Sequence, residues 1–355
     1  MFFLWLWWDR TLRSGSLPIP ALMANQKEIA RLANVSQSVV SRVLSGRSKD
    51  RPISEETVAR VRQIAEALDY QPNQAARMLV GGKTRLIGVI VRSFDDQYLT
   101  KILQELNKRA LRSGYTLLVV GFENGEFDAK EIRLLCNYRP DAFVVIGSTD
   151  FAKWDGAFFK DEKPVIQIGV PAHDPRVISC GIDEREAARL IVTHLAELGH
   201  RTVGVIGDNS AASRLRLAIV KEALAAQGLA CLLPCCFMSQ QRDTAAGTDA
   251  AAYFLDDSVR AHWPTAVVAL EDLVALAFIR RLGDAGVAVP AALSVASYDD
   301  IESAVLVRPA LTTIHQPVQS LAGAGMDMIT GTSERASVLL TPTLQVREST
   351  AAPRK

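Results

Sequence analysis

The sequence of 355 residues predicts an α/β protein with a small helical unit at its N-terminus and a larger core of parallel sheets. The two parts also differ in the sign of their net charge. Residues 24–83 hold ten Lys and Arg against six Asp and Glu, whereas residues 84–355 hold 28 Lys and Arg against 32 Asp and Glu. A basic segment next to an acidic one indicates that any polyanion binds near the N-terminus. From Thr84 on, short runs rich in Val and Ile alternate with helical segments, which is typical of parallel sheets covered on both faces.

The first 23 residues contain the apolar run Phe2–Trp8, which is too short to span a bilayer and has no basic region before it. We therefore predict no membrane partner. Met23 is the simpler natural start, so we expect residues 1–23 to form a disordered extension.

Two short helices are predicted after this extension. Asn25 can cap a helix over 26–33 whose inward residues are Ile29, Ala30 and Leu32, and Asn34 tolerates the left-handed conformation of a tight turn. Ser36 then caps a helix over 37–44. Two short helices across such a turn form a helix-turn-helix, whose second helix is offered to the DNA major groove.

The second helix has two different faces. Its apolar face holds Val39, Val40, Val43 and Leu44, and its opposite face holds Gln37, Ser38, Ser41, Arg42 and Ser45. The polar face contains no acid and suits base edges and phosphates, although a merely solvated helix face is the simpler alternative for an isolated helix. A third helix begins after Ser54 with an apolar stripe that can cover the second one: Val58, Val61, Ile64, Ala65 and Leu68.

The segment 72–83 can form only about seven residues of helix between a cap at Asn73 and a stop at Gly81, and so short a helix is unstable in water. We expect it to order only on a surface. Its GGKT end is no phosphate-binding loop, because Arg77 stands where such a loop needs glycine.

The core from Thr84 contains seven predicted strands and at least four helices. The strands are RLIGVIV, YTLLVV, DAFVVIG, PVIQIG, TVGVIG, TAVVAL and SVASY, and the helices cover residues 99–113, 129–138, 184–198 and 215–227. This length suffices for two α/β lobes, and two facing lobes suggest a ligand cleft beyond the carboxyl ends of their strands. The closing segment 337–350 has β character.

The five cysteines form no CxxC pair, so the sequence predicts neither a disulfide framework nor a zinc ribbon but reduced thiols in a cytoplasm. The cluster Cys231, Cys235 and Cys236 has no His or acid beside it, and we interpret it as a run of buried small residues. We predict no metal and no cofactor.

These residues resemble the LacI/GalR family of bacterial transcriptional regulators. The resemblance covers 24–350 and is strongest in EIARLANVSQSVVSRVL, ISEETVARVRQIAEALDYQPNQAARML, AELGHRTVGVIG and VASYDDIESAVLVRPALTTIHQPV. It implies a helix-turn-helix DNA-binding headpiece at 24–71, a hinge helix and linker at 72–83, and a two-lobed core at 84–350 similar to periplasmic binding proteins. We expect lobe one at about 84–181 plus 311–331 and lobe two at about 182–310.

The resemblance also implies site residues. DNA contacts fall on the headpiece and the hinge, where Leu79 would wedge into the minor groove: Asn25, Ser36, Gln37, Ser38, Ser41, Arg42, Asn73, Ala76, Arg77 and Leu79. Effector contacts fall in the cleft: Phe94, Asp95, Tyr98, Ser148, Arg214, Glu271 and Asp299. Glu271 departs from the family's usual Asn, which puts a neutral hexose in doubt. Together with Asp95 and Asp96, it favours a ligand with donors or a cation.

The sequence thus predicts a cytoplasmic, homodimeric regulator, expected to be a repressor, that binds double-stranded operator DNA. Its affinity would respond to a small-molecule effector, whether a sugar, a sugar derivative or another polar metabolite. Two alternatives are an α/β enzyme with an appended basic module and a solute-binding protein. No GxSxG, Walker, GxGxxG, HExxH or zinc motif supports an enzyme.

Overall fold

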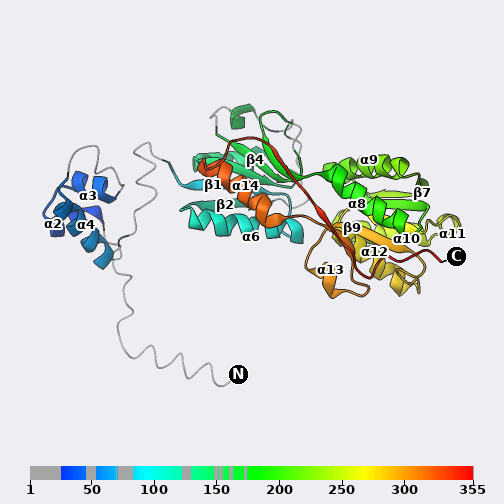
Figure 1. The fold of residues 1–355 in the computed structure, drawn as a ribbon. Coiled ribbons are helices and arrows are strands. Elements are labelled where there is room, and N and C mark those ends of the chain that lie inside the picture. The colour runs from blue at the N-terminus through cyan, green and yellow to red at the C-terminus, as the bar shows by residue number, and fades with distance from the viewer. Residues whose placement is uncertain are drawn as a thin grey trace, which may run out of the picture. The chain divides into compact units, whose positions relative to one another are not determined.

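The computed structural model describes residues 25–44, 53–68, 70, 83–121, 129–147, 151, 154, 156–159, 163–171 and 174–354. The chain divides into two compact units between Thr84 and Arg85 (Figure 1). The predicted extension, the hinge contacts and one predicted effector contact lie outside the described residues: 1–23, Asn73, Ala76, Arg77, Leu79 and Ser148.

The first unit contains α2 (Gln26–Ala33), α3 (Gln37–Leu44) and α4 (Glu55–Ala67). The Oδ1 atom of Asn25 accepts a hydrogen bond from the backbone N of Glu28 at 3.0 Å, and Asn34 adopts the left-handed conformation at φ 53°. The predicted bounds and caps of the first two helices are therefore confirmed.

The core of this unit lies where the apolar faces of the three helices meet. Val40 and Val43 of α3 are buried there, as predicted, together with Val61 of α4. Leu32 is an exception, because 46% of its surface is exposed and Ala33 takes the inward position instead. The helical rotation between neighbouring positions places only one of these two residues on the buried stripe.

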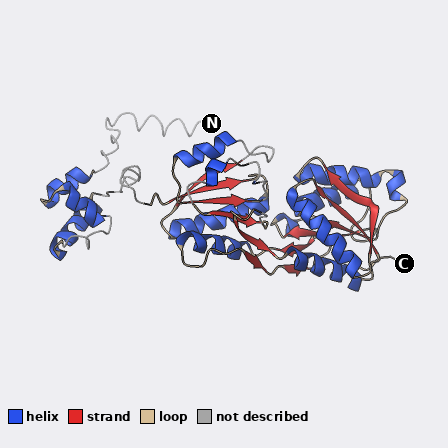
Figure 2. Cartoon of the chain, turned by 90° about the horizontal axis from the view of Figure 1, so that it is seen from above, coloured by secondary structure: helices blue, strands red, loops and turns tan. Residues whose placement is uncertain are grey.

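The second unit contains two lobes, each built on a six-stranded sheet covered by helices (Figure 2). The first sheet has the strand order β11-β5-β4-β3-β1-β2 and is parallel throughout. Its strands are β1 (Leu86–Val91), β2 (Thr116–Gly121), β3 (Ala142–Ile146), β4 (Val165–Gly169), β5 (Ile178–Ile182) and β11 (Val338–Leu340). Its helices are α6 (Gln97–Arg112), α7 (Ala129–Asn137), the 3-10 helix η3 (Gly156–Phe159) and α14 (Val318–Thr330).

The second sheet has the order β12-β10-β9-β8-β6-β7, with only β12 antiparallel to its neighbour. Its strands are β6 (Thr202–Asp208), β7 (Ala230–Ser239), β8 (Ala266–Ala269), β9 (Ser294–Asp299), β10 (Thr312–His315) and β12 (Thr343–Gln345). Its helices are α8 (Glu184–Glu197), α9 (Ala211–Ala226), α10 (Asp243–Leu255), α11 (Asp257–Arg260), α12 (Asp272–Asp284) and α13 (Ser303–Leu306).

The chain crosses between the lobes three times: after β5, after β10 and after β11. Figure 1 shows the last crossing as the red segment that runs from one lobe to the other. We expected residues 311–331 to belong to lobe one, and this expectation is wrong for β10. β10 pairs with β9 and β12 in the second sheet, and only the following α14 packs on α6 of the first lobe.

The seven predicted strands of the core all form, because each is a largely apolar run. Six of them are buried almost throughout, and only β2, at the edge of its sheet, is partly exposed. β5, β7 and β10 were not predicted, since Ser, Gly, Cys, Pro and Thr interrupt their apolar pattern. Among the described helices, none combines the length and the hydrophobicity required to span a membrane.

Candidate functional site

The outward face of α3 is polar. Gln37, Ser38 and Ser41 are exposed on it, while Val40 and Val43 on the opposite face are buried. Arg42 is half-buried, and its Nε lies 3.4 Å from the backbone oxygen of Ser38, to which it donates. This face presents hydrogen-bonding groups and one guanidinium with no acidic residue among them, which is the chemistry that a nucleic-acid groove requires.

Two of the predicted DNA contacts already have structural roles as caps. Asn25 caps α2, and the Oγ of Ser36 accepts from the backbone N of Val39 at 3.4 Å. The Ser36 Oγ also lies 2.8 Å from the Oγ of Ser38, so the two hydroxyls are linked. A capping side chain can still contact a phosphate with its remaining hydrogen-bonding capacity.

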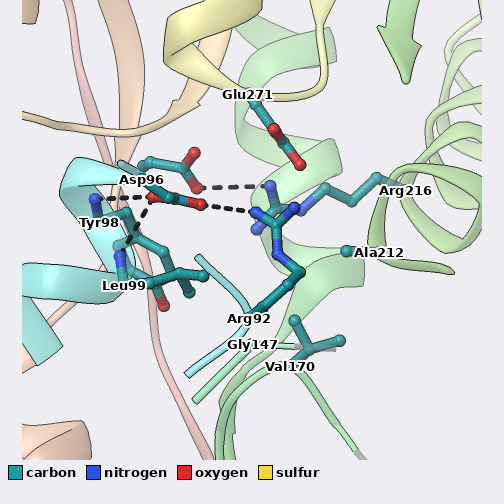
Figure 3. A pocket seen from close by; sticks show the side chains of 10 residues that line it. Arg92, Asp96, Tyr98, Leu99, Gly147, Val170, Ala212, Arg216 and Glu271 are labelled. Atoms are coloured by element: carbon teal, nitrogen blue, oxygen red, sulfur yellow. Dashed lines mark hydrogen bonds and ion pairs between the residues drawn. The ribbon is translucent and has the colours of Figure 1, made fainter. Parts of the chain in front are cut away.

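A pocket lies between the two lobes of the second unit, at the carboxyl ends of their strands (Figure 3). Its empty volume is about 330 Å³, part of which is open to solvent. The first lobe supplies Arg92, Asp96, Tyr98, Leu99, Gly147 and Val170, and the second supplies Ala212, Arg216, Glu271 and Asp299. Strand ends of open α/β sheets are where such folds bind ligands.

The first-lobe wall is held by an ion pair. Nη2 of Arg92 lies 2.6 Å from Oδ2 of Asp96, and both side chains are nearly buried. Asp96 also caps α6, because its Oδ1 accepts from the backbone N of Tyr98 at 2.9 Å. Burial alone would lower the pKa of Arg92, but the carboxylates of Glu271 and Asp96 raise it above the usual value, so this guanidinium stays charged.

A glycine allows this wall to close. Gly147 follows β3 at φ 94°, and a Cβ at this position would lie 3.2 Å from the Cβ of Arg92 and 3.2 Å from Cδ1 of Leu99. Glycine is the residue that adopts positive φ without cost, and its missing side chain leaves room for the Arg92 stem.

The second-lobe wall is built around Arg216. Its Nε lies 3.1 Å from Oε2 of Glu184, and its Nη1 donates to the backbone oxygen of Leu270 at 2.7 Å. The same Nη1 lies 3.4 Å from Oδ1 of Asp299, and the guanidinium carbon is 4.7 Å from the centre of the Tyr298 ring. Arg216 is therefore fixed by two carboxylates, a carbonyl and an aromatic ring.

Asp299 ends β9 with a backbone φ of 111°, a region that non-glycine residues rarely adopt. Nε2 of Gln316 donates to its carboxylate at 2.7 Å, and the Tyr98 hydroxyl donates to Oε1 of Gln316 at 2.6 Å. This chain of hydrogen bonds links the two lobes through the second crossover. Burial, opposed by the nearby Arg216, raises the pKa of Asp299 to about 6.

Asp272 lies behind the pocket and orders the strand ends. Its carboxylate accepts from the hydroxyl of Ser297, from the hydroxyl of Thr313 at 2.7 Å and from the backbone N of Ile301 at 3.0 Å. These donors belong to β9, to β10 and to the loop after β9. Burial and the neighbouring Asp299 raise the pKa of Asp272 to about 8. Asp272 is the first residue of α12, so this network also fixes Glu271 at the pocket wall.

Glu271 differs from the other charged residues of the pocket. Only 8% of its surface is exposed, yet its carboxylate forms no hydrogen bond or ion pair with any residue that the structure describes. Figure 3 shows this carboxylate directed into the space that the guanidinium groups of Arg92 and Arg216 border. Burial and the nearby Asp208 raise the pKa of Glu271 well above its usual value.

The structure brings three of the six described effector candidates together, namely Tyr98, Glu271 and Asp299. The other three do not line the pocket. Phe94 is 53% exposed and covers Gly121 of β2, Asp95 is exposed, and Arg214 is exposed with its guanidinium on the backbone oxygen of Asn209.

Sequence reasoning missed Arg92 and Arg216 as pocket residues, and it named Asp96 only for its charge. For Arg216 a signal existed, because Ala212, Ile219 and Val220 place it on the inward stripe of α9. A charged residue on a buried helical stripe needs a partner, and such residues gather at functional sites.

Two family models match the chain. One, described as bacterial regulatory proteins of the lacI family, matches residues 26–73. The other, described as a periplasmic binding protein-like domain, matches residues 192–350. The first match covers α2 to α4, and the second covers the second lobe and both later crossovers.

Curated relatives are similar over most of the chain. Catabolite control protein A of Staphylococcus aureus is 27% identical over 312 residues, which cover 85% of this chain and 90% of that protein. The HTH-type transcriptional repressor PurR of Photobacterium profundum is 27% identical over 336 residues, or 92% of this chain and 98% of that protein. The second of these relatives is a transcriptional repressor by name.

Solved structures share the fold. The Lac repressor bound to ONPG in the repressed state is 25% identical with a TM-score of 0.77, covering 92% of this chain and 99% of that one. The Lac repressor dimer bound to operator and the anti-inducer ONPF is 24% identical with a TM-score of 0.79, covering 93% and 99%. The order of helices and strands found here is thus that of a known regulator fold.

Proposed function

Because the chain belongs to the LacI family of bacterial regulatory proteins, we propose that it represses transcription by binding double-stranded operator DNA in a sequence-specific way. A small polar molecule bound in the interlobe pocket would change its affinity for that operator. The observation that carries the DNA-binding part is the exposed, acid-free polar face of α3, with Gln37, Ser38 and Arg42 as base-reading candidates.

The effector part is supported by the composition of the pocket. Charged residues from both lobes surround a space open to solvent, and the Tyr98–Gln316–Asp299 hydrogen bonds join the lobes beside it. A ligand that contacts both walls would stabilise one relative position of the lobes over another. We assign effector binding to Tyr98, Glu271 and Asp299, together with Arg92, Asp96 and Arg216.

We further propose that the protein acts as a homodimer in the cytoplasm and has no enzymatic activity. Two copies would present two α3 helices to the half-sites of a near-palindrome. The Lac repressor is a dimer on its operator in one of the similar structures, which supports this assembly. The domain bounds 24–71, 72–83 and 84–350 remain our proposal, with hinge contacts at Asn73, Ala76, Arg77 and Leu79 in the minor groove.

The test is a selection of genomic fragments by the purified full chain, taken from the organism that carries the gene. We expect enrichment of one near-palindromic sequence at low ionic strength, followed by its release or tightening when a small-molecule extract is added. No sequence preference with or without extract would overturn the proposal. Turnover of a compound from the extract would support the alternative of an enzyme instead.

A further inference from the structure

We propose that the effector of the interlobe pocket carries a protonated amine, and that its ammonium group pairs with the carboxylate of Glu271. This inference rests on the proposed function, because it takes the pocket to be the effector site. It adds the chemical class of the ligand.

The first observation is that Glu271 is nine-tenths buried and has no partner among the described residues. A buried carboxylate without a hydrogen bond or an ion pair is unfavourable, so proteins pair such groups or neutralise them. Its direction into the pocket in Figure 3 leaves the pocket space as the place for that partner.

The second observation is that the guanidinium groups near Glu271, although Arg92 attracts its carboxylate, each form their ion pairs with other carboxylates. Arg92 is paired with Asp96, and Arg216 is paired with Glu184 and with Asp299. Two guanidinium groups thus face four carboxylates when Glu271 is counted. The fully buried Asp208 adds to this excess, because its Oδ2 has no hydrogen-bond partner in the described structure.

An ammonium group compensates this deficit of positive charge better than other ligand groups do. An anion would meet an excess of carboxylates, and a hydroxyl can donate a hydrogen bond but cannot compensate the charge. A bare metal ion is disfavoured, since the described residues form no group of three or more His, Cys, Asp or Glu suited to ligate one. A primary ammonium brings one positive charge and three donors in a compact group.

The experiment separates ligands by charge. A small-molecule extract of the cells that carry the gene is divided on ion exchangers into cationic, neutral and anionic fractions. Each fraction is added to the full chain on its selected operator, and the change in operator affinity is measured. We expect the active compound in the cationic fraction and its loss from that fraction after acetylation of amines.

The outcomes distinguish this inference from the proposed function. Activity in the neutral or the anionic fraction that acetylation of amines does not abolish would overturn the amine while leaving the effector pocket in place. Operator binding that no fraction changes would overturn the effector function and the amine together. Activity that survives complete acetylation would also refute the role of the amine.

A matched pair of variants tests whether Glu271 binds the amine. Glu271→Gln keeps the shape of the side chain but removes its charge, and we expect at least a tenfold higher concentration of the cationic fraction for the same effect. Glu302→Gln removes an exposed carboxylate of the same lobe and should leave the response unchanged. Equal responses of both variants to the cationic fraction would exclude Glu271 as the partner of the amine.

A second inference comes from β7 and is independent of the pocket. We infer that Cys231 and Cys236 form an oxidisable thiol pair. Their Sγ atoms lie 3.3 Å apart, because β7 bulges between the residues that pair with Val203 and Val205 of β6. Both thiols are half-exposed, so the interpretation of this cluster as buried small residues is correct only for Cys235.

A hydroperoxide is the oxidant that this pair requires. The Cys236 thiolate attacks one peroxide oxygen, which gives a sulfenic acid and hydroxide, and the Cys231 thiol then displaces water to form the S–S bond. Two thiols are oxidised and one peroxide is reduced. The hydrogen bond from Cys231, helped by Lys221, lowers the pKa of Cys236 to about 7, so a large thiolate fraction exists near neutral pH.

The test treats the full chain with hydrogen peroxide and measures mass and free thiols. We expect a loss of about 2 Da, the disappearance of two thiols and full reversal by dithiothreitol. Cys235→Ser should still show this loss of mass, whereas Cys231→Ser and Cys236→Ser should not. A loss of mass that persists in Cys236→Ser, or added oxygen in place of it, would refute the pair.

Discussion

Arg214 and Arg216 stand two positions apart on α9, and their surroundings are opposite. Two helical positions correspond to about 200° of rotation, so only one of the two can face the pocket. Arg216 lies with Ala212 and Ile219 on the buried stripe, while Arg214 is exposed to solvent. A family pattern read along the sequence selected Arg214, which does not line the pocket, whereas the helical period would have selected Arg216, which does.

Arg42 carries a prediction about base recognition. We expect Arg42→Ala to weaken binding by about 1–3 kcal/mol at one base pair of the operator and to relax the preference there. Titrations with the operator and with single-base variants measure this loss. Arg60→Ala on α4 is the control, because losing an exposed cation should weaken binding to all sequences alike. An equal loss on cognate and scrambled DNA for Arg42→Ala would exclude base reading.

Asp272 carries a prediction about pH. Its folded pKa of about 8 lies above the unfolded value of about 3.9, so the folded state holds a proton that the unfolded state has released. The stability it contributes is full below about pH 4 and is lost as pH rises through about 8. Asp272→Asn should therefore flatten the fall in unfolding free energy between about pH 7 and 9.

Urea unfolding of the full chain at several pH values provides the measurement. The window above about pH 7 avoids the titration of Asp299, whose pKa is about 6. Asp257→Asn, at an exposed position on the same lobe, should keep the pH dependence of the unchanged protein. If the two variants show the same slope, Asp272 is ionised in the folded protein at neutral pH.

At the scale of elements, the packing of α10 against α12 depends on one glycine. A Cβ at Gly247 of α10 would lie 2.2 Å from the backbone oxygen of Val274, so the two helices could not keep their present distance. We expect Gly247→Ala to lower the unfolding free energy by about 1–3 kcal/mol. Chemical denaturation checks this value.

Gly283 provides the matched comparison on α12. A Cβ there meets nothing within 4 Å, and the residue is exposed. Gly283→Ala should therefore raise the unfolding free energy by up to about 1 kcal/mol, since alanine restricts the unfolded chain. The two Gly→Ala changes in neighbouring helices would thus change the unfolding free energy in opposite directions. A stabilising Gly247→Ala would contradict the close packing described here.

The strands that the sequence did not predict share one cause. β5, β7 and β10 contain Gly, Cys, Pro or Thr instead of an unbroken Val and Ile run, so their local pattern does not differ clearly from a loop. They form because neighbouring strands supply the hydrogen bonds of the sheet. Tertiary pairing overrides weak local propensity in such strands.

At the scale of the whole molecule, the division of charge predicts the salt dependence of binding. The basic first unit should contact phosphates, so the logarithm of the operator affinity should fall steeply and linearly with the logarithm of the salt concentration. We expect a much weaker salt dependence for the effector, because the charged side chains that would hold it, such as Arg92, Arg216 and Glu271, are nearly buried. Titrations of both ligands from about 50 to 200 mM salt test this difference. An operator affinity independent of salt would exclude phosphate contacts by this unit.

The sequence alone determined the helix-turn-helix, its caps, its apolar stripes and the seven strongest strands. All of these depend on residues close together in the chain, through helical period, capping chemistry and uninterrupted apolar runs. The polar face of α3 follows from the same local rules. Local order therefore specified the first unit and the residues that carry the resemblance to the LacI family.

Only the tertiary structure decided which charged residues meet. The pocket joins the ends of strands as distant in the sequence as β1 and β9. The chain also crosses between the lobes three times, so β10 lies in the second sheet instead of the first. Whether a carboxylate has a partner depends on distances across the two lobes, which residue spacing does not encode. Asp96, which forms an ion pair, and Glu271, which has no partner among the described residues, therefore became distinguishable only when the chain was folded.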